Sequence, residues 1–262
     1  MASTWDPAQY LTFADHRLRP ALELLTRVPL DVVASIADLG CGSGNALPFM
    51  RSRWPDASYV GVDSSPEMLA RAEADHPDDH WLEADAATWH PDQPVSLVFS
   101  NATLHWVGDH ATLLPRLMEL VVPGGVLAIQ MPANFGQPTH TTIAEVARDR
   151  AWSVDLESAL QGVPVAAPSW YHQLLSPVSQ HLDVWTTTYI QELEGPDAVT
   201  AWVSGSALRP VLTALTDAEA GEFTAEYTRR VNVHYPRRSD GVTLLPFTRL
   251  FLVATAPPAP SS

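Results

Sequence analysis

Three glycines at alternate positions, Gly40, Gly42 and Gly44, form a turn that could bind a ligand through its backbone. Glycine has no Cβ, so the N–H groups of such a turn and of the following helix can approach a ligand closely. The dinucleotide fingerprint Gly-x-Gly-x-x-Gly places its last glycine one position later, which disfavours a nicotinamide-dependent dehydrogenase. Asp38 lies two residues before the first glycine. A carboxylate there suits a ligand with an ammonium group better than a pyrophosphate.

Two further acids follow the glycine turn, each at the end of a predicted strand. Asp63 lies about twenty residues on, where a carboxylate can accept hydrogen bonds from ribose hydroxyls. Asp85 follows the next predicted strand and could accept a hydrogen bond from an adenine amino group. Each acid alone could be a helix cap, and a glycine turn alone could merely be tight. In this order and at this spacing, they predict a nucleoside site.

The elements that must position these residues alternate between strand and helix. The pattern predicts strands at 35–39, 58–62, 80–83, 95–100 and 126–131, and helices at 45–54, 66–75 and 111–121. Alternation at this spacing favours right-handed βαβ units and a parallel sheet. The Pro-Gly-Gly segment 123–125 predicts a turn, and Ser64 or Ser65 is expected to cap the helix that starts at Pro66.

The rest of the chain is expected to add helical material around this core. We predict an N-terminal helical lid at 1–30, the core at 31–133, a helical cap at 134–242 with one core strand near 183–192, closing strands at 243–255 and a disordered tail at 256–262. A length of 262 residues suits one αβ domain of ordinary size with such additions.

Charge and composition exclude several classes of protein. The formal net charge is −15, and all 15 basic residues are arginine, so the chain lacks the positive stripe that nucleic acid requires. The longest apolar run, Leu120–Met131, is too short to span a membrane. The N-terminus shows no basic-then-apolar leader, and the single cysteine, Cys41, excludes an internal disulfide framework. We therefore expect a cytoplasmic protein, and no obligate protein partner is evident.

Four segments resemble motifs of the class I S-adenosylmethionine-dependent methyltransferases. They are Asp38–Gly44, Val62–Ser65, Glu83–Asp85, and Phe99–Ala102 followed by Leu104–Trp106. The resemblance implies a Rossmann-like α/β fold with a seven-stranded, mostly parallel sheet, an antiparallel last strand and a helical cap. It implies S-adenosylmethionine as cofactor and S-adenosylhomocysteine as its product. The cofactor-binding residues would be Asp38, Gly40, Cys41, Gly42, Gly44, Asn45, Asp63, Ser64, Met68, Asp85, Ala86, Asn101, and Arg17 on the N-terminal helix.

Short segments along nearly the whole chain resemble a narrower family, the trans-aconitate methyltransferases. They include Trp5–Pro7, Gln130–Pro132, Pro138–His140, Thr187–Tyr189, Trp202–Val203, Leu208–Pro210 and Phe247–Phe251. Residues 148–168 have no clear counterpart in that pattern. The resemblance implies esterification of one carboxylate of trans-aconitate or a similar small polycarboxylate.

A carboxylate acceptor needs no general base, because its pKa of about 4 leaves it ionised at neutral pH. We therefore assign no catalytic acid–base residue, and expect the site to align the reacting atoms and exclude water. Arg209 and Arg249 are the first candidates for the carboxylates that do not react, although either could pair with a surface acid instead. Neutral groups suit the reacting end, and the further candidates for acceptor binding are Tyr10, Trp106, His140 and Tyr189.

Two alternatives remain open. A methyltransferase of this fold could use another small acceptor, such as a phenol or a secondary metabolite, or a relative without catalytic activity could keep the cofactor pocket. No metal site is predicted. His76 and His80 lie among acids, but in a segment containing Pro77 that we interpret as a solvated turn.

Overall fold

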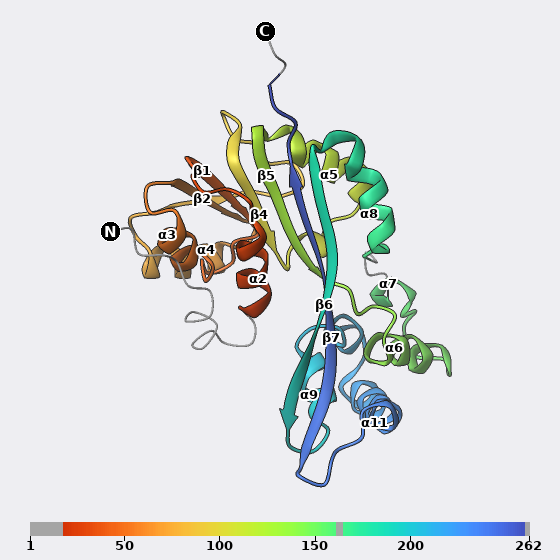
Figure 1. Ribbon diagram of the computed structural model, residues 1–262. Helices are drawn as coiled ribbons and strands as arrows, with labels where there is room; N and C mark the ends of the chain where they lie inside the picture. Colours follow the sequence, from red (N-terminus) through yellow and green to blue (C-terminus); the bar gives the residue numbers. More distant parts are fainter. Residues whose placement is uncertain (1–17, 161–164, 260–262) are drawn as a thin grey trace. The chain divides into compact units, whose positions relative to one another are not determined.

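The computed structural model describes residues 18–160 and 165–259, and its central element is a seven-stranded sheet (Figure 1). The strands are β1 (Ser35–Leu39), β2 (Ser58–Asp63), β3 (His80–Glu83), β4 (Val95–Asn101), β5 (Val121–Pro132), β6 (His181–Glu194) and β7 (Val242–Thr255). Their order is β3-β2-β1-β4-β5-β7-β6. The predicted seven-stranded Rossmann-like sheet is confirmed.

The first five strands are parallel, whereas β7 runs antiparallel to β5. Parallel pairs join β1 to β2 and β4, β2 to β3, and β4 to β5. The Ala256 N–H donates to the Gly125 carbonyl and the Ala133 N–H donates to the Thr248 carbonyl, each at 2.9 Å, so residue numbers rise along one strand as they fall along the other. The carboxyl ends of β1 to β5 therefore meet at one edge of the sheet, which is where ligands bind in such folds.

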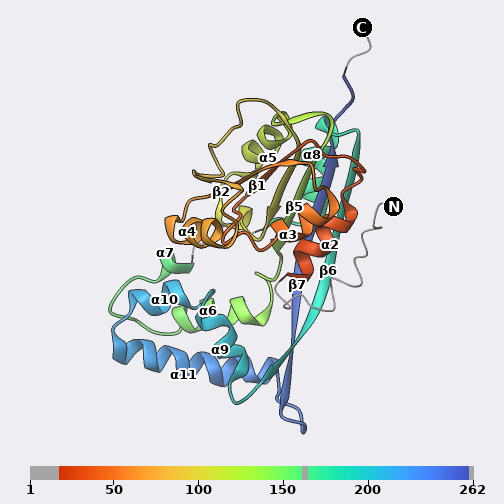
Figure 2. The same cartoon turned by 90° about the vertical axis from the view of Figure 1, so that its left-hand side faces the viewer.

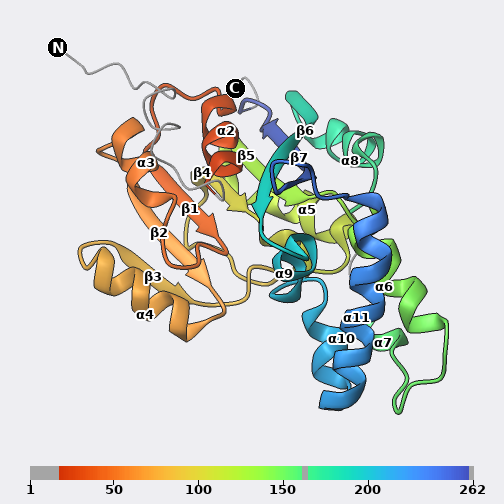
Figure 3. The same ribbon diagram turned by 90° about the horizontal axis from the view of Figure 1, so that it is seen from below.

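Five helices of the described residues lie beside the strands of the parallel part of the sheet. They are α2 (Arg19–Arg27), α3 (Leu47–Arg53), α4 (Pro66–Asp75), α5 (His110–Glu119) and α8 (Pro168–Leu175). The order runs from β1 to β3 in one direction and from β4 to β5 in the other, so right-handed crossovers place α3 and α4 on one face and α5 on the opposite face (Figure 3). Helix α2, the described part of the predicted lid, buries Leu22, Leu24 and Leu25.

The chain divides into two compact units. The first contains residues up to Met131, Ala166–Thr186, and residues from Leu250 on; the second contains Pro132–Val165 and Thr187–Arg249. The predicted cap at 134–242 coincides only in part with the second unit, because residues 166–186, including α8, group with the first.

The second unit has an apolar core of its own. Its helices are α6 (Pro138–Arg148), α7 (Glu157–Leu160), α9 (Ala198–Ser204), α10 (Arg209–Ala214) and α11 (Asp217–His234). Figure 2 shows α11 running beside α6, α9 and α10. Val146, Val199, Val211, Phe223 and Tyr227 are among the buried residues of this core.

The start of β5 differs from the prediction. The Pro-Gly-Gly segment is not a turn before the strand but an irregularity within it, and β5 begins at Val121. Val95 pairs with Val121 and Leu97 pairs with Val126, so β5 bulges between these pairs, with Gly124 at a φ of 75°. As a result α5 ends at Glu119, before the predicted residue 121.

Two further boundaries also differ. Helix α3 begins at Leu47 rather than at the predicted residue 45, because Asn45 and Ala46 form a turn. The predicted disordered tail at 256–262 is wrong for its first residues: Ala256 is 6% exposed, and the Pro257 carbonyl accepts a hydrogen bond from the Gly124 N–H. Residues 260–262 lie outside the described residues. In residues 18–160 and 165–259, no helix combines the length and apolar character needed to cross a bilayer.

One carboxylate lies inside the sheet. Asp38 on β1 is 2% exposed, and the Tyr59 hydroxyl on β2 donates a hydrogen bond to its Oδ2 at 3.1 Å. Burial raises the pKa of Asp38 from 3.8 to about 7; the hydrogen bond from Tyr59 opposes this shift, and the negative charge of Asp63 adds to it. The folded protein therefore retains a proton on Asp38 at pH values where the unfolded chain has lost it.

We expect Asp38→Asn to remove part of the pH dependence of stability. Because the pKa is higher in the folded state, the contribution of Asp38 to stability falls as the pH rises from about 4 to about 7 and stays low above that range. The unfolding free energy of the variant should match that of the wild type near pH 4, and should exceed it by at most about 4 kcal/mol above pH 7. Urea unfolding across this range measures the difference, and a difference independent of pH would contradict the expectation.

Candidate functional site

The turn at 40–44 has all three glycines in the left-handed region, with φ values of 73°, 55° and 77° for Gly40, Gly42 and Gly44. The space around them differs. A Cβ on Gly40 would lie 2.0 Å from Oγ1 of Thr103, and one on Gly44 would lie 2.6 Å from the ring of Trp81. A Cβ on Gly42 would meet nothing within 4 Å. Packing thus requires glycine at 40 and 44, and the backbone at Gly42 is open to a ligand.

Asp63, at the end of β2, orients this turn. Its Oδ2 accepts a hydrogen bond from the Gly42 N–H and its Oδ1 accepts one from the Ser65 N–H, both at 2.9 Å. Each carboxylate oxygen can accept a second hydrogen bond, so these contacts leave Asp63 able to bind ribose hydroxyls as predicted. The Ser65 hydroxyl in turn accepts from the Met68 N–H at 3.3 Å, which identifies Ser65 as the N-cap of α4.

The acids around the turn make it favourable for a cation. Burial, followed by the charges of Asp38 and Asp63, raises the pKa of the Cys41 thiol. Cys41 is therefore a neutral thiol at pH 7 and a poor nucleophile. The same negative potential stabilises a positively charged ligand. Asp38 is buried and its Oδ2 accepts a hydrogen bond from the Tyr59 hydroxyl; its expected contact with an ammonium group of the ligand stays a prediction.

The other predicted cofactor residues follow the ends of strands along the same edge. The exposed ones are Asn45, Ser64, Met68 and Asp85, and the buried one is Ala86. Asp85 stabilises its own turn, since its Oδ1 accepts from the Ala87 N–H at 2.8 Å. The Oδ1 of Asn101, at the end of β4, is buried without a hydrogen-bond partner among the described residues. Arg17 lies outside the described residues.

Two residues that shape the turn were not singled out from the sequence. Trp81 on β3 pairs in register with Gly61, its ring covers the positions that Cβ atoms of Gly44 and Gly61 would take, and its Nε1 donates to the His76 carbonyl at 3.0 Å. The Thr103 hydroxyl donates to the Gly40 carbonyl at 3.1 Å. Only the strand register could have revealed them, because each acts on a glycine distant in sequence.

In the first unit, Trp106 lies on a short 3-10 helix, η1 (Leu104–Trp106), and is 70% exposed. A buried histidine fixes this segment: Nε2 of His110 lies 2.9 Å from the Leu104 carbonyl and its Nδ1 lies 2.7 Å from the Tyr171 hydroxyl. A carbonyl can only accept, so Nε2 of His110 carries a proton and donates to it. Helices α5 and α8 thus hold the segment that presents Trp106.

In the second unit, Tyr189 and Arg249 lie on adjacent strands, β6 and β7, close enough to interact electrostatically. The Arg249 guanidinium lies 4.4 Å from the centre of the Phe247 ring, and its buried Nε has no hydrogen-bond partner among the described residues. Burial lowers the pKa of Arg249 to about 10, partly opposed by Tyr189, so the side chain stays cationic at pH 7. Two predicted acceptor-binding residues are therefore brought together.

The remaining candidates are more scattered. His140 has Nδ1 3.1 Å from the Thr139 hydroxyl, and burial lowers its pKa, so it is neutral at pH 7. Arg209 is exposed at the start of α10 and forms no ion pair with a described acid. Tyr10 lies outside the described residues. Within residues 18–160 and 165–259, no group of three or more His, Cys, Asp or Glu is placed to bind a metal ion.

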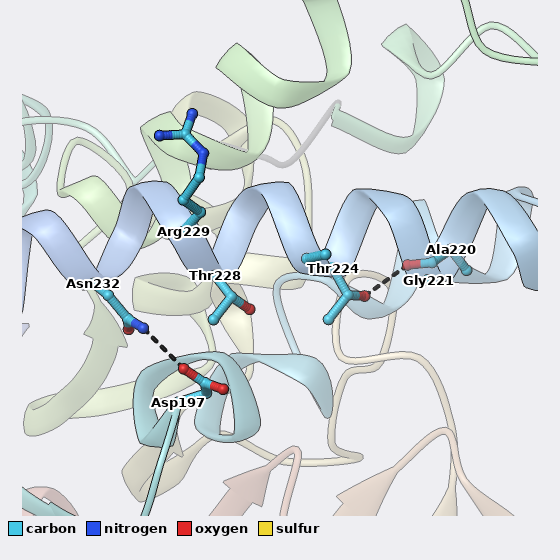
Figure 4. A pocket seen from close by; sticks show the side chains of 8 residues that line it. Asp197, Ala220, Gly221, Thr224, Thr228, Arg229 and Asn232 are labelled. Atoms are coloured by element: carbon cyan, nitrogen blue, oxygen red, sulfur yellow. Dashed lines mark hydrogen bonds between the residues drawn. The ribbon is translucent and has the colours of Figure 1, made fainter.

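A surface hollow elsewhere contains none of these residues. It lies between α11 and the start of α9, where Nδ2 of Asn232 donates to Oδ1 of Asp197 at 2.9 Å (Figure 4). Its other lining residues are mostly small side chains of α11, and Arg229 is paired with Glu226. The hollow offers no group suited to methyl transfer.

Comparison with solved structures supports the fold. The YcgJ protein from Bacillus subtilis superimposes with a TM-score of 0.58 at 11% identity, covering 92% of this chain and 98% of that chain. A phosphoethanolamine N-methyltransferase 2 from Haemonchus contortus, solved with S-adenosylhomocysteine, gives a TM-score of 0.54 at 17% identity, covering 90% of this chain and 52% of that chain. At such low identity, the likeness shows the fold alone.

Comparison of sequences is more specific. A family model described as a methyltransferase domain matches residues 36–125. A trans-aconitate 2-methyltransferase from Azoarcus sp. (strain BH72) is 47% identical over 251 residues, covering 96% of this chain and 98% of the relative. One from Methylobacterium radiotolerans is 44% identical, covering 95% of this chain and 97% of the relative. With this identity over nearly the whole length of both chains, the chain belongs to the trans-aconitate 2-methyltransferase family.

Proposed function

We propose that this protein transfers a methyl group from S-adenosylmethionine to one carboxylate of trans-aconitate or a similar small polycarboxylate. The products are a monomethyl ester and S-adenosylhomocysteine. Membership in the family supports the reaction and the acceptor. The observation that carries the cofactor assignment is the glycine turn, whose backbone is open at Gly42 and whose surroundings contain the carboxylates of Asp38 and Asp63.

The residues at the edge of the sheet fit this cofactor in charge and in polarity. The Asp63 carboxylate can accept from the ribose hydroxyls, and the second oxygen of Asp85 can accept from the adenine amino group. The negative charge of Asp63, and that of Asp38 at pH values where it is ionised, favour the cationic sulfonium and ammonium groups over a neutral nucleoside. The negative field around Cys41 thus has a role in recognition, although the thiol itself does not react.

The chemistry requires alignment more than proton transfer. When bound, S-adenosylmethionine supplies an electrophilic methyl group on a positively charged sulfur. The acceptor carboxylate is already ionised at pH 7, so no residue of the chain must remove a proton. Its negative charge and the positive charge of the sulfonium cancel during transfer, so exclusion of water by the protein favours the reaction. Residues around the acceptor therefore orient its oxygen and exclude solvent.

Arg249 is the cation in the second unit best suited to a carboxylate that does not react. A half-buried guanidinium whose buried Nε lacks a partner gains more from a carboxylate than an exposed arginine does, because exposed ion pairs contribute little. Tyr189 is its neighbour, and neutral His140 and exposed Trp106 are further contacts for the acceptor. Arg209 is a secondary candidate, since it is exposed.

The proposal extends to the setting in which the enzyme works. We place it in the cytoplasm, acting on a small molecule, with neither nucleic acid nor an obligate protein partner. A different small acceptor and a binding protein without catalysis are the outcomes that the first experiment must separate.

Purified protein with labelled S-adenosylmethionine and trans-aconitate should give a base-labile methyl ester and S-adenosylhomocysteine. Mass spectrometry and label release in alkali measure the product. A panel of other polycarboxylates and a phenol defines the acceptor class. Transfer to the phenol alone would overturn the carboxylate assignment, whereas cofactor binding without transfer to any acceptor would indicate a protein without catalytic activity.

Gly42→Ala should fold but bind S-adenosylhomocysteine at least tenfold more weakly, about 1.4 kcal/mol, because its Cβ projects where the ligand approaches the backbone. Gly124→Ala is the matched control: it has a similar φ and open surroundings, but lies in the β5 bulge. Gly40→Ala should instead lose stability through its clash with Thr103. Calorimetry and thermal unfolding measure these effects. Equal ligand affinity in Gly42→Ala and Gly124→Ala would argue against the turn as the cofactor site.

Arg249→Gln should raise the acceptor KM about tenfold to a hundredfold, since a hydrogen bond to a charged group contributes about 1.5–3 kcal/mol. Affinity for S-adenosylhomocysteine should not change. Arg238→Gln is the charge-matched control, because Arg238 is exposed and paired with Asp240. Steady-state kinetics measure the acceptor KM of each variant. The same KM in both variants would show that Arg249 does not bind the acceptor.

A further inference from the structure

Two amide side chains at the ends of β4 and β5 have buried atoms without hydrogen-bond partners. Asn101 and Gln130 are partners in the parallel register, so their side chains leave the same face of the sheet from Cα atoms about 5 Å apart. Gln130 is fully buried, and neither its Nε2 nor its Oε1 has a partner among the described residues.

A buried amide without a hydrogen-bond partner lowers the stability of a folded protein. Nearly all buried polar side chains in folded proteins are hydrogen-bonded, and each exception requires an explanation. The backbone beside the amides is strained as well: Ala102 has a φ of 57°, and its N–H donates to the Gln130 carbonyl at 2.9 Å. Left-handed residues other than glycine concentrate at functional sites, where the surrounding structure maintains the strain.

The strand register places the amides next to the cofactor turn. Leu39 pairs with Val62, so Gly40 lies opposite Asp63; Asp38 pairs with Phe99, so Asn101 lies beside Gly40 on the other flank. The row across the edge of the sheet therefore runs from Asp63 through Gly40 and Asn101 to Gln130. Acids for the nucleoside occupy its β2 end, and neutral amides occupy its β5 end.

We propose that Gln130 binds the acceptor, with its Nε2–H donating to the carboxylate that receives the methyl group; this rests on the proposed function. A carboxylate oxygen forms the new bond to the methyl carbon as the carbon–sulfur bond breaks and its electron pair passes to sulfur. No proton moves, so a group that does not titrate is sufficient. A neutral amide orients the carboxylate without the stronger attraction of a guanidinium, which would reduce its nucleophilicity.

A substitution that removes the amide tests this role, because the stability of the protein should be kept while its activity on the acceptor falls. Gln130→Met keeps the size of the side chain and removes the unpartnered atoms, so its Tm should equal or exceed that of the wild type. Its KM for the polycarboxylate should rise about tenfold to a hundredfold, as expected for loss of a hydrogen bond to a charged group. Gln130→Glu, which keeps the shape but places an anion against the carboxylate, should raise KM further. Affinity for S-adenosylhomocysteine should stay within twofold in the methionine variant.

Thr142→Val is the matched control. Thr142 lies on α6, is fully buried, and its hydroxyl also has no partner among the described residues. This variant should gain stability as Gln130→Met does, with an unchanged KM. If Gln130→Met also keeps its KM while the wild type esterifies polycarboxylates, Gln130 is structural and the inference is wrong. If the wild type shows no such transfer, the proposed function fails first, which is a separate outcome.

Discussion

The carboxyl end of β1 is held in place by both of its neighbours, and the site depends on this. From β2, the Asp63 carboxylate accepts the Gly42 N–H. From the segment after β4, Thr103 occupies the space of the Cβ that Gly40 lacks and donates to the Gly40 carbonyl. The turn is thus held in a left-handed conformation before any ligand binds, so binding requires little further ordering of its backbone.

Local features of the structure could be predicted from the sequence. The buried strands, and a cap at Ser64 or Ser65 for the helix that starts at Pro66, follow from apolar patterns and capping chemistry over a few residues. The prediction of a turn at the Pro-Gly-Gly segment is wrong because bulges and turns favour the same types of residue. Only the pairing of Val95 and Leu97 with β5 distinguishes them.

Features that depend on strand register could not be predicted. The spacing of Asp38 does not reveal that its carboxylate is buried and accepts a hydrogen bond from Tyr59 on the next strand. Tyr189 and Arg249 were each selected for their chemistry, and only the pairing of β6 with β7 brings them together. Burial alone does not identify a binding arginine either. The guanidinium of Arg53 donates to the backbone carbonyl of Val28 at 2.7 Å, whereas the Nε of Arg249 has no such partner.

The strand order has a consequence for how the chain folds. Strands β1 to β5 are consecutive, so they can pair through short crossovers while the rest is still being synthesised. Strand β7 comes last in the sequence but lies between β5 and β6. The sheet is therefore completed by a long-range pairing that waits for almost the entire chain, and such pairings are slow. Until then β5 has an open edge, so nascent or C-terminally truncated chains expose a surface prone to aggregation.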